Sequence, residues 1–134
     1  PARDLPMTTV AIVEDNAVVG ASLRRIVESA PDCTCVGVWR SGEEALEVAS
    51  ARRWRFDAVI SDYRLGAGLT GVQAAQELMR QSGRDIPTLI LTGDTATEHI
   101  AEIAASGFEL LHKPVSAEQL RRKLARLLAS EAVS

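Results

Sequence analysis

The residues best suited to chemistry are carboxylic acids that follow short apolar runs. Glu14 and Asp15 follow the run TVAIV, and Asp62 follows a second run that ends in AVIS. Clustered carboxylates repel one another and raise one another's pKa, and a hard divalent cation such as Mg²⁺ removes that cost. A carboxylate can also act as a nucleophile that accepts a phosphoryl group. The three acids therefore indicate metal-dependent phosphoryl chemistry.

A hydroxyl group and an ammonium group follow two further apolar runs. Thr92 follows the run LIL, and Lys113, one of only two lysines in the chain, comes shortly after the run FELL. A threonine hydroxyl can donate a hydrogen bond, and a lysine supplies a compact positive charge. Both groups suit phosphoryl transfer, in which catalysis is mostly positioning and charge neutralisation.

Gly66, Gly68 and Gly71 spell G-x-G-x-x-G, the pattern of a dinucleotide-binding turn. Such a turn has its first glycine directly at a strand end and holds pyrophosphate on the N-terminus of the next helix. Here Asp62 occupies the strand end, where its charge would repel pyrophosphate. We therefore interpret the glycines as a flexible loop beside an acidic site, and Asp94 as a residue near that site.

The hydrophobic periodicity predicts a strand followed by a helix, repeated five times. The expected strands are residues 9–13, 33–39, 56–61, 89–91 and 108–111. The expected helices are residues 19–27, 42–53, 71–81, 96–105 and 117–128. This alternation predicts an α/β fold, with a doubly wound parallel sheet that carries helices on both faces.

The predicted sheet brings the chemical groups together. The site of an open parallel sheet lies beyond the carboxyl ends of its strands, at the point where the strand order reverses. Four of the five predicted strands are followed by groups of matching chemistry. These groups are expected to converge at one edge of the sheet, and they are Glu14, Asp15, Asp62, Thr92 and Lys113.

Size and composition fit one globular domain, with 134 residues of which 46% are hydrophobic and 25% charged. A net charge of −3 gives no electrostatic reason to expect direct nucleic-acid binding. No apolar run approaches the roughly 20 residues of a membrane span, and no signal segment opens the chain, so a cytoplasmic location is expected. Cys33 and Cys35 would share one face of a strand and are expected to stay unbridged.

Four stretches of the chain resemble the motifs of response-regulator receiver domains, namely AIVEDN, AVISDYRL, LILTGD and LLHKPV. The resemblance covers residues 8–130 and leaves residues 1–7 and 131–134 as tails. It implies a flavodoxin-like fold, in which a five-stranded parallel sheet of order 2-1-3-4-5 has two helices on one face and three on the other. It also implies a role in a bacterial two-component system or phosphorelay.

The resemblance implies a role for each residue of the acidic site. Asp62 would accept a phosphoryl group from a phosphohistidine on a histidine kinase or a histidine phosphotransfer domain. Asp15 would bind Mg²⁺ directly and Glu14 mainly through water, with Mn²⁺ as a substitute metal. The backbone carbonyl of Arg64 would complete the metal shell, and Lys113 would contact the phosphoryl oxygens.

The resemblance also implies a conformational switch. Thr92 would turn inward to hydrogen-bond the phosphoryl group, with Gly93 leaving room beside it. Arg64 and Asp94 flank the site, and from this position we expect them to tune hydrolysis of the phosphoryl group. The Lys113–Pro114 peptide bond would be cis. The chain departs from the family pattern at Leu110, where family members usually carry Tyr or Phe as the moving aromatic residue of the switch.

The parent protein and the partner are predicted from finer similarities. The stretches TLILTGDT and SGFELLHKPVS are similar to receivers at the C-terminus of hybrid sensor histidine kinases, and a stand-alone single-domain regulator is the alternative. The chain begins with Pro1 rather than Met, so it is expected to be either a piece of a longer protein or a trimmed chain. The expected docking patch for the histidine donor lies on the first helix, at Ala17, Val18, Ala21 and Ser22. The sequence predicts no oligomeric state.

Two other enzyme classes fit the acids less well. A haloacid-dehalogenase-type phosphatase, which is Mg²⁺-dependent and has an aspartyl nucleophile, needs D-x-D after the first strand, where this chain has Glu14-Asp15-Asn16. A Toprim-type nuclease or topoisomerase module needs a later D-x-D, where this chain has Asp62-Tyr63-Arg64. The domain is therefore expected to catalyse only its own phosphorylation and its slow dephosphorylation.

Overall fold

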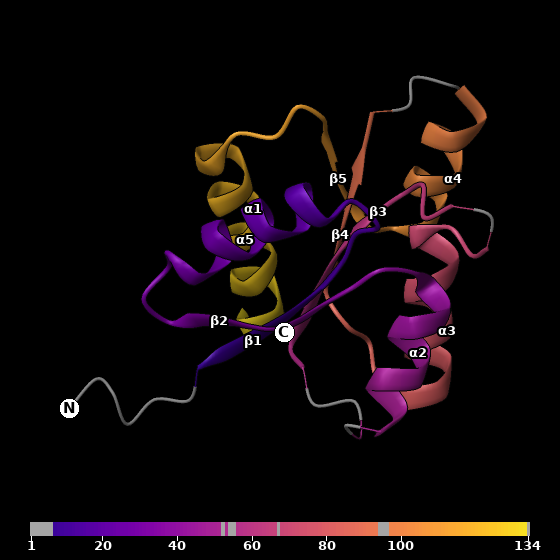
Figure 1. Cartoon of the computed structure of the whole chain (residues 1–134), viewed down its shortest axis with the longest axis horizontal. Coiled ribbons are helices and arrows are strands. Elements are labelled where there is room, and N and C mark those ends of the chain that lie inside the picture. The colour runs from indigo at the N-terminus through magenta and orange to yellow at the C-terminus, as the bar shows by residue number, and fades with distance from the viewer. Residues whose placement is uncertain (1–6, 52, 54–55, 67, 94–96, 134) are drawn as a thin grey trace.

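The computed structural model describes residues 7–51, 53, 56–66, 68–93 and 97–133, with side chains as far as residue 128. Five strands and five helices alternate along the chain (Figure 1). The strands are β1 (Thr8–Val13), β2 (Cys33–Trp39), β3 (Ala58–Asp62), β4 (Thr88–Thr92) and β5 (Glu109–His112). The helices are α1 (Ala17–Glu28), α2 (Gly42–Ala51), α3 (Gly71–Ser82), α4 (Thr97–Ser106) and α5 (Ala117–Val133).

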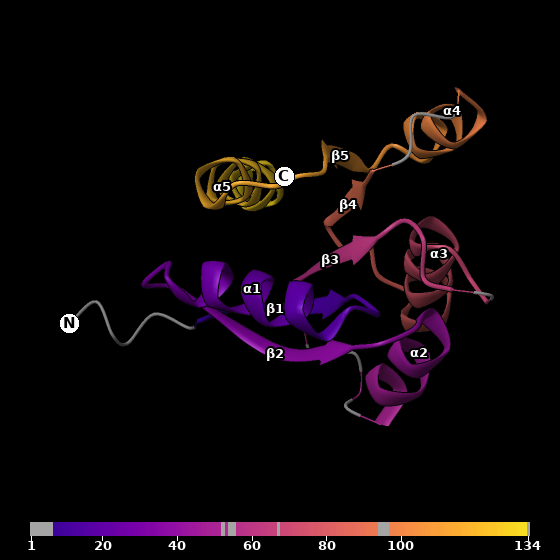
Figure 2. The same cartoon turned by 45° about the horizontal axis from the view of Figure 1, so that its top comes forward.

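All strand pairs are parallel, and the sheet order is β2-β1-β3-β4-β5, which confirms the predicted order. Helices α1 and α5 cover one face of the sheet, and α2, α3 and α4 cover the other (Figure 2). The strand order reverses between β1 and β3, which lie side by side. This is the position at which a doubly wound sheet is expected to carry its site.

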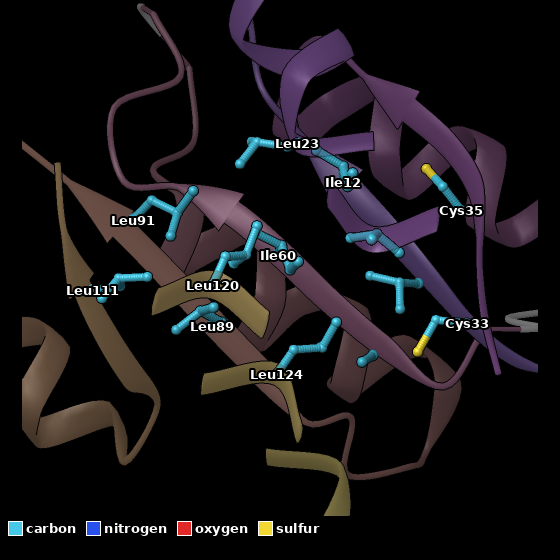
Figure 3. Close-up of a cluster of buried hydrophobic side chains, with 13 residues drawn as sticks. Ile12, Leu23, Cys33, Cys35, Ile60, Leu89, Leu91, Leu111, Leu120 and Leu124 are labelled. Atoms are coloured by element: carbon cyan, nitrogen blue, oxygen red, sulfur yellow. The ribbon is translucent and has the colours of Figure 1, made fainter. Parts of the chain in front are cut away.

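The alternation of side chains along β1 explains why the sheet is covered on both faces. Val10 and Ile12 join the core under α1 and α5, whereas Ala11 and Val13 join the core under α2 and α3. Figure 3 shows the first of these cores, in which leucines of α1 and α5 lie over aliphatic side chains of the sheet. The same core holds both cysteines of β2, which are buried and free, as predicted.

Local signals set the helix ends that matter for the site. The side chain of Asn16 caps α1 and accepts hydrogen bonds from the N–H groups of Val18 and Val19. Thr70 caps α3 in a capping box with Gln73. Both caps place the start of a helix directly beyond the carboxyl end of a strand.

Most elements differ from the sequence expectation at one or both ends. Strand β3 includes Asp62, because this residue still pairs with Leu91 of β4. Helix α2 ends at Ala51, two residues earlier than expected, and Arg53 has a left-handed backbone with φ of 56°. Helix α5 continues to Val133, so residues 131–133, which were expected to form a tail, are helical. None of the described helices is both long enough and apolar enough to span a membrane.

Candidate functional site

Three acids meet at the carboxyl ends of β1 and β3, where the strand order reverses. Glu14, Asp15 and Asp62 each offer a carboxylate oxygen, and these oxygens all lie within 4.8 Å of one another. Glu14 is 2% exposed and Asp62 is 8% exposed, whereas Asp15 is open to solvent. The neighbouring strands β1 and β3 thus bring together acids that are 47 or more positions apart in the sequence.

Lys113 reaches the acids from the end of β5. Its Nζ lies 3.2 Å from Oδ2 of Asp62 and 3.5 Å from Oε1 of Glu14. The backbone N–H of Lys113 donates to the carbonyl of Thr92 at 2.8 Å, which ties the lysine to the end of β4. The Lys113–Pro114 peptide bond is cis, the geometry that the family resemblance implied.

Burial sets the electrostatics of the site. It raises the pKa of Asp62, and the attraction of Lys113 offsets this effect only in part. Burial also raises the pKa of Glu14, with further repulsion from Asp62. Burial alone would lower the pKa of Lys113, but its attraction to the two acids outweighs this, and the pKa is raised. The single positive charge of Lys113 therefore does not balance the negative charges of the three acids.

The donor set of the cluster fits a hard divalent cation. All three offered ligands are carboxylate oxygens, which Mg²⁺ prefers, and the two buried acids have raised pKa values. A bound cation would lower the cost of keeping both buried acids ionised. The residues present therefore fit the metal that the sequence indicated.

The remaining predicted residues differ in their burial and in their neighbours. Thr92 ends β4 and is 1% exposed. A Cβ on Gly93 would meet the Cβ of Lys113 at 3.9 Å, an ordinary van der Waals contact. Arg64 is exposed, two positions after Asp62. Leu110 is half-buried and packs against a cluster that contains Tyr63. Asp94 lies outside the described residues.

Gly71 has a role at the site that sequence reasoning missed. A Cβ at Gly71 would lie 2.2 Å from the backbone carbonyl oxygen of Asp62 and 2.8 Å from Oγ of Ser61. Helix α3 can therefore start against β3 only if this residue is glycine. The T-x-x-Q capping box marks Gly71 as the first residue of a helix, but no local pattern shows how closely that helix approaches β3.

The start of α3 also shows why G-x-G-x-x-G does not form a dinucleotide site. The N–H of Gly71 donates to the carbonyl of Tyr63, and the N–H of Gln73 donates to Oγ1 of Thr70. These donors are used within the protein, so they are not available to pyrophosphate. Gly66, with φ of 86°, lies in the turn between β3 and α3.

Comparison of the sequence with known proteins identifies the family of the chain. The family model described as the response regulator receiver domain matches residues 10–125. The response regulator MprA of Mycolicibacterium vanbaalenii is 32% identical over 120 residues, which are 89% of this chain and 49% of that protein. MprA of Mycobacterium leprae is also 32% identical, over 89% of this chain and 50% of its own length. The chain thus spans about half the length of these curated relatives.

Solved structures share both the fold and some sequence. The signal receiver domain of a modulated diguanylate cyclase from Desulfovibrio desulfuricans superposes with a TM-score of 0.82 at 28% identity, over 95% of this chain and 98% of that one. The chemotaxis protein CheY4 of Vibrio cholerae has a TM-score of 0.78 at 29% identity, over 90% of this chain and 98% of that one. The chain therefore belongs to the response regulator receiver domain family.

Proposed function

We propose that this chain accepts a phosphoryl group on Asp62 from a phosphohistidine and changes conformation as a result. Membership of the family places the chain in two-component signalling as a receiver domain. Receiver domains are phosphorylated by histidine kinases or histidine phosphotransfer proteins. The observation that carries the finer proposal is the buried carboxylate of Asp62, which lies 3.2 Å from Nζ of Lys113 and beside two further acids.

Mg²⁺ is the proposed cofactor, with Mn²⁺ as a substitute. Asp15 and Asp62 would hold it directly and Glu14 mainly through water, with the backbone carbonyl of Arg64 as a further ligand. When bound, the cation would neutralise charge on the acids and on the phosphoryl oxygens.

Each side chain of the site would have its own role in phosphoryl transfer. The ionised Asp62 forms the new O–P bond while the N–P bond of the phosphohistidine breaks, and the donor imidazole leaves. Lys113, already beside Asp62, contacts the transferred phosphoryl oxygens. Thr92 turns toward the phosphoryl group and donates a hydrogen bond to it from the hydroxyl. This movement of Thr92 starts the conformational change.

Incubation with acetyl phosphate tests the proposed function without a protein partner. Intact mass spectrometry would count the phosphoryl groups on the chain in the presence of Mg²⁺ and in the presence of EDTA. We expect one phosphoryl group per chain with Mg²⁺ and none with EDTA. The proposal is wrong if no adduct forms in Mg²⁺ and beryllofluoride also fails to bind.

Mg²⁺ alone is expected to raise the melting temperature, because it binds the folded acid cluster and not the unfolded chain. The stabilisation should approach about 2.7 kcal/mol when free Mg²⁺ reaches 100 times its Kd. Asp15→Asn removes one of the three acids and should abolish most of this rise. Thermal unfolding over a Mg²⁺ titration measures both effects.

The matched control for this titration is Asp85→Asn. Asp85 is exposed and lies before the start of β4, at the opposite edge of the sheet. It should keep the full Mg²⁺ effect. An undiminished rise in Asp15→Asn would place the metal elsewhere on the molecule.

The docking patch expected on α1 lies beside the site. Val18 is 79% exposed, and with Ser22 it lines a groove of about 330 Å³ that also contains Lys113 and Pro114. We propose that a histidine donor docks on this part of α1. Its apolar character and its position next to Lys113 support the proposal.

A charge placed in this patch should separate the two routes of phosphorylation. Ala21→Glu is expected to slow transfer from a phosphorylated histidine phosphotransfer domain by tenfold or more, because an apolar contact becomes a desolvated charge. Transfer from acetyl phosphate should be unchanged. Ala51→Glu, at the exposed end of α2, is the control. Equal slowing of both routes in Ala21→Glu would contradict the docking proposal.

The identity of the parent protein is the finest part of the proposal. The relatives at 32% identity are named response regulators. This name is closer to the alternative, a stand-alone regulator, than to a hybrid sensor histidine kinase. The hybrid-kinase origin therefore stays a prediction from the sequence.

A further inference from the structure

Tyr63 follows Asp62 directly, and its backbone is held on two sides. Its N–H donates to the carbonyl of Leu91 at 2.8 Å, and its carbonyl accepts from the N–H of Gly71, also at 2.8 Å. A planar peptide bond joins Asp62 to Tyr63, so a displacement of the first backbone is passed to the second. The side chain of Tyr63 is 4% exposed, and the sequence motifs assigned it no role.

The side chain of Tyr63 reaches helix α4, which comes much later in the chain. Its hydroxyl donates a hydrogen bond to Oε1 of Glu102 at 2.5 Å. Its ring lies beside the imidazole of His99, with 4.9 Å between the ring centroids and 38° between the planes. His99 and Glu102 are three positions apart, so they share one face of the helix. A single side chain at the acceptor strand thus contacts two neighbouring positions on α4.

Helix α4 is anchored by little buried surface of its own. All of Thr97–Ser106 is described, and within it only Ile103 is buried. Ile103 belongs to the same apolar cluster as Tyr63. Figure 2 shows α4 at the end of its layer, beyond α3. Segments with few buried apolar contacts open locally at low free-energy cost, so the contacts of Tyr63 weigh heavily in the stability of α4.

We propose that Tyr63 couples the phosphorylation state of Asp62 to helix α4, through its hydrogen bond to Glu102 and its ring contact with His99. The inference rests on the proposed function, because it requires that Asp62 change state. It also requires that the contacts between Tyr63 and α4 differ in strength between the two states of Asp62. Tyr63 is then a positioning residue that acts on α4 through these two contacts.

Tyr63→Phe isolates the hydrogen bond, because it removes the hydroxyl and keeps the ring. Intact mass after acetyl phosphate treatment first establishes whether each protein forms the aspartyl adduct. Hydrogen exchange of the α4 amides is then measured with Mg²⁺, with and without beryllofluoride. We expect the wild-type amides to change their exchange rates about fivefold, the size of one net hydrogen bond. Tyr63→Phe should form the adduct normally and lose most of that change.

Three further variants make the experiment specific. Glu102→Gln keeps a side-chain carbonyl that can accept the same hydrogen bond, so it should behave like the wild type. Glu102→Ala should behave like Tyr63→Phe. Val27→Ala destabilises the core on the other face of the sheet and should leave the α4 response intact.

The two possible failures are distinguishable. A full α4 response in Tyr63→Phe, or no α4 response in a wild-type chain that forms the adduct, overturns the coupling and leaves the proposed function standing. A wild-type chain that forms no adduct and binds no beryllofluoride overturns the proposed function, and the coupling falls with it.

Discussion

Asp62→Asn is expected to abolish phosphoryl transfer to this chain and to leave it folded and at least as stable. Asparagine keeps the shape of the side chain and an oxygen that can face Lys113. Its amide, however, cannot replace the carboxylate as the nucleophile that accepts the phosphoryl group. Intact mass after acetyl phosphate and Mg²⁺ should show no adduct. Asp57→Asn, just before the start of β3, should form the adduct like the wild type, because its carboxylate accepts hydrogen bonds from Thr9 at the opposite end of the strands.

The stability part of this prediction follows from the raised pKa of Asp62. Burial disfavours the ionised carboxylate in the folded chain more than Lys113 favours it. The folded chain therefore releases this proton at a higher pH than the unfolded chain. Stability falls as the pH rises between the two pKa values, and the loss persists at neutral pH. Asparagine carries no such loss, so without Mg²⁺ the melting temperature of Asp62→Asn should equal or exceed that of the wild type.

Two results would contradict the role given to Asp62. An adduct of normal extent in Asp62→Asn would move the acceptor to another residue, and peptide mapping would then locate it. A large loss of stability in the variant would show that the ion pair with Lys113 outweighs the cost of burial.

Gly71→Ala is expected to have the largest effect of any conservative change outside the acids. The new methyl group would lie 2.2 Å from the carbonyl oxygen of Asp62, and neither backbone can yield without moving the acceptor strand or the start of α3. Overpacking of this kind costs about 1–3 kcal/mol, and the upper end applies where the obstacle is backbone. Urea unfolding measures this loss, and acetyl phosphate measures the accompanying fall in adduct formation.

Gly68→Ala provides the matched control for this change. Its methyl group would also meet an atom at short range, but that atom is the carboxylate end of the Glu43 side chain, which can rotate away. The cost should stay within about 1 kcal/mol, the size of the hydrogen bond between Glu43 and the N–H of Leu69. Equal losses in the two variants would show that the close approach at Gly71 is not what constrains α3.

The sequence predicted the architecture because its apolar runs are short and clearly bounded. Runs of three to seven residues that are followed by acids or turn residues, and that alternate with helical periods, favour the strands of a doubly wound sheet. Strand β2 was predicted with its observed ends. The meeting of Glu14, Asp15 and Asp62 followed from the same logic, because the ends of parallel strands share one edge.

The features that were missed depend on distances between distant parts of the chain. The contact of Gly71 with Asp62 arises from how closely α3 approaches β3, which no local pattern encodes. The hydrogen bond from Tyr63 to Glu102 spans 39 positions and depends on where α4 packs. The exact end of β3 was misplaced because an acid at the carboxyl end of a buried strand reads as the start of a loop.

The contact between Glu14 and Lys113 joins residues 99 positions apart, and this separation orders events during synthesis of the protein. The ribosome makes all three acids before it makes the lysine. Once β1 and β3 have paired on the emerging chain, the acids of the proposed metal site would already lie together, while the ammonium group proposed to contact the phosphoryl group is still missing. During synthesis, each chain should therefore be able to bind metal before Asp62 can be phosphorylated. A receiver domain that is still being synthesised should not accept phosphoryl groups from its partners.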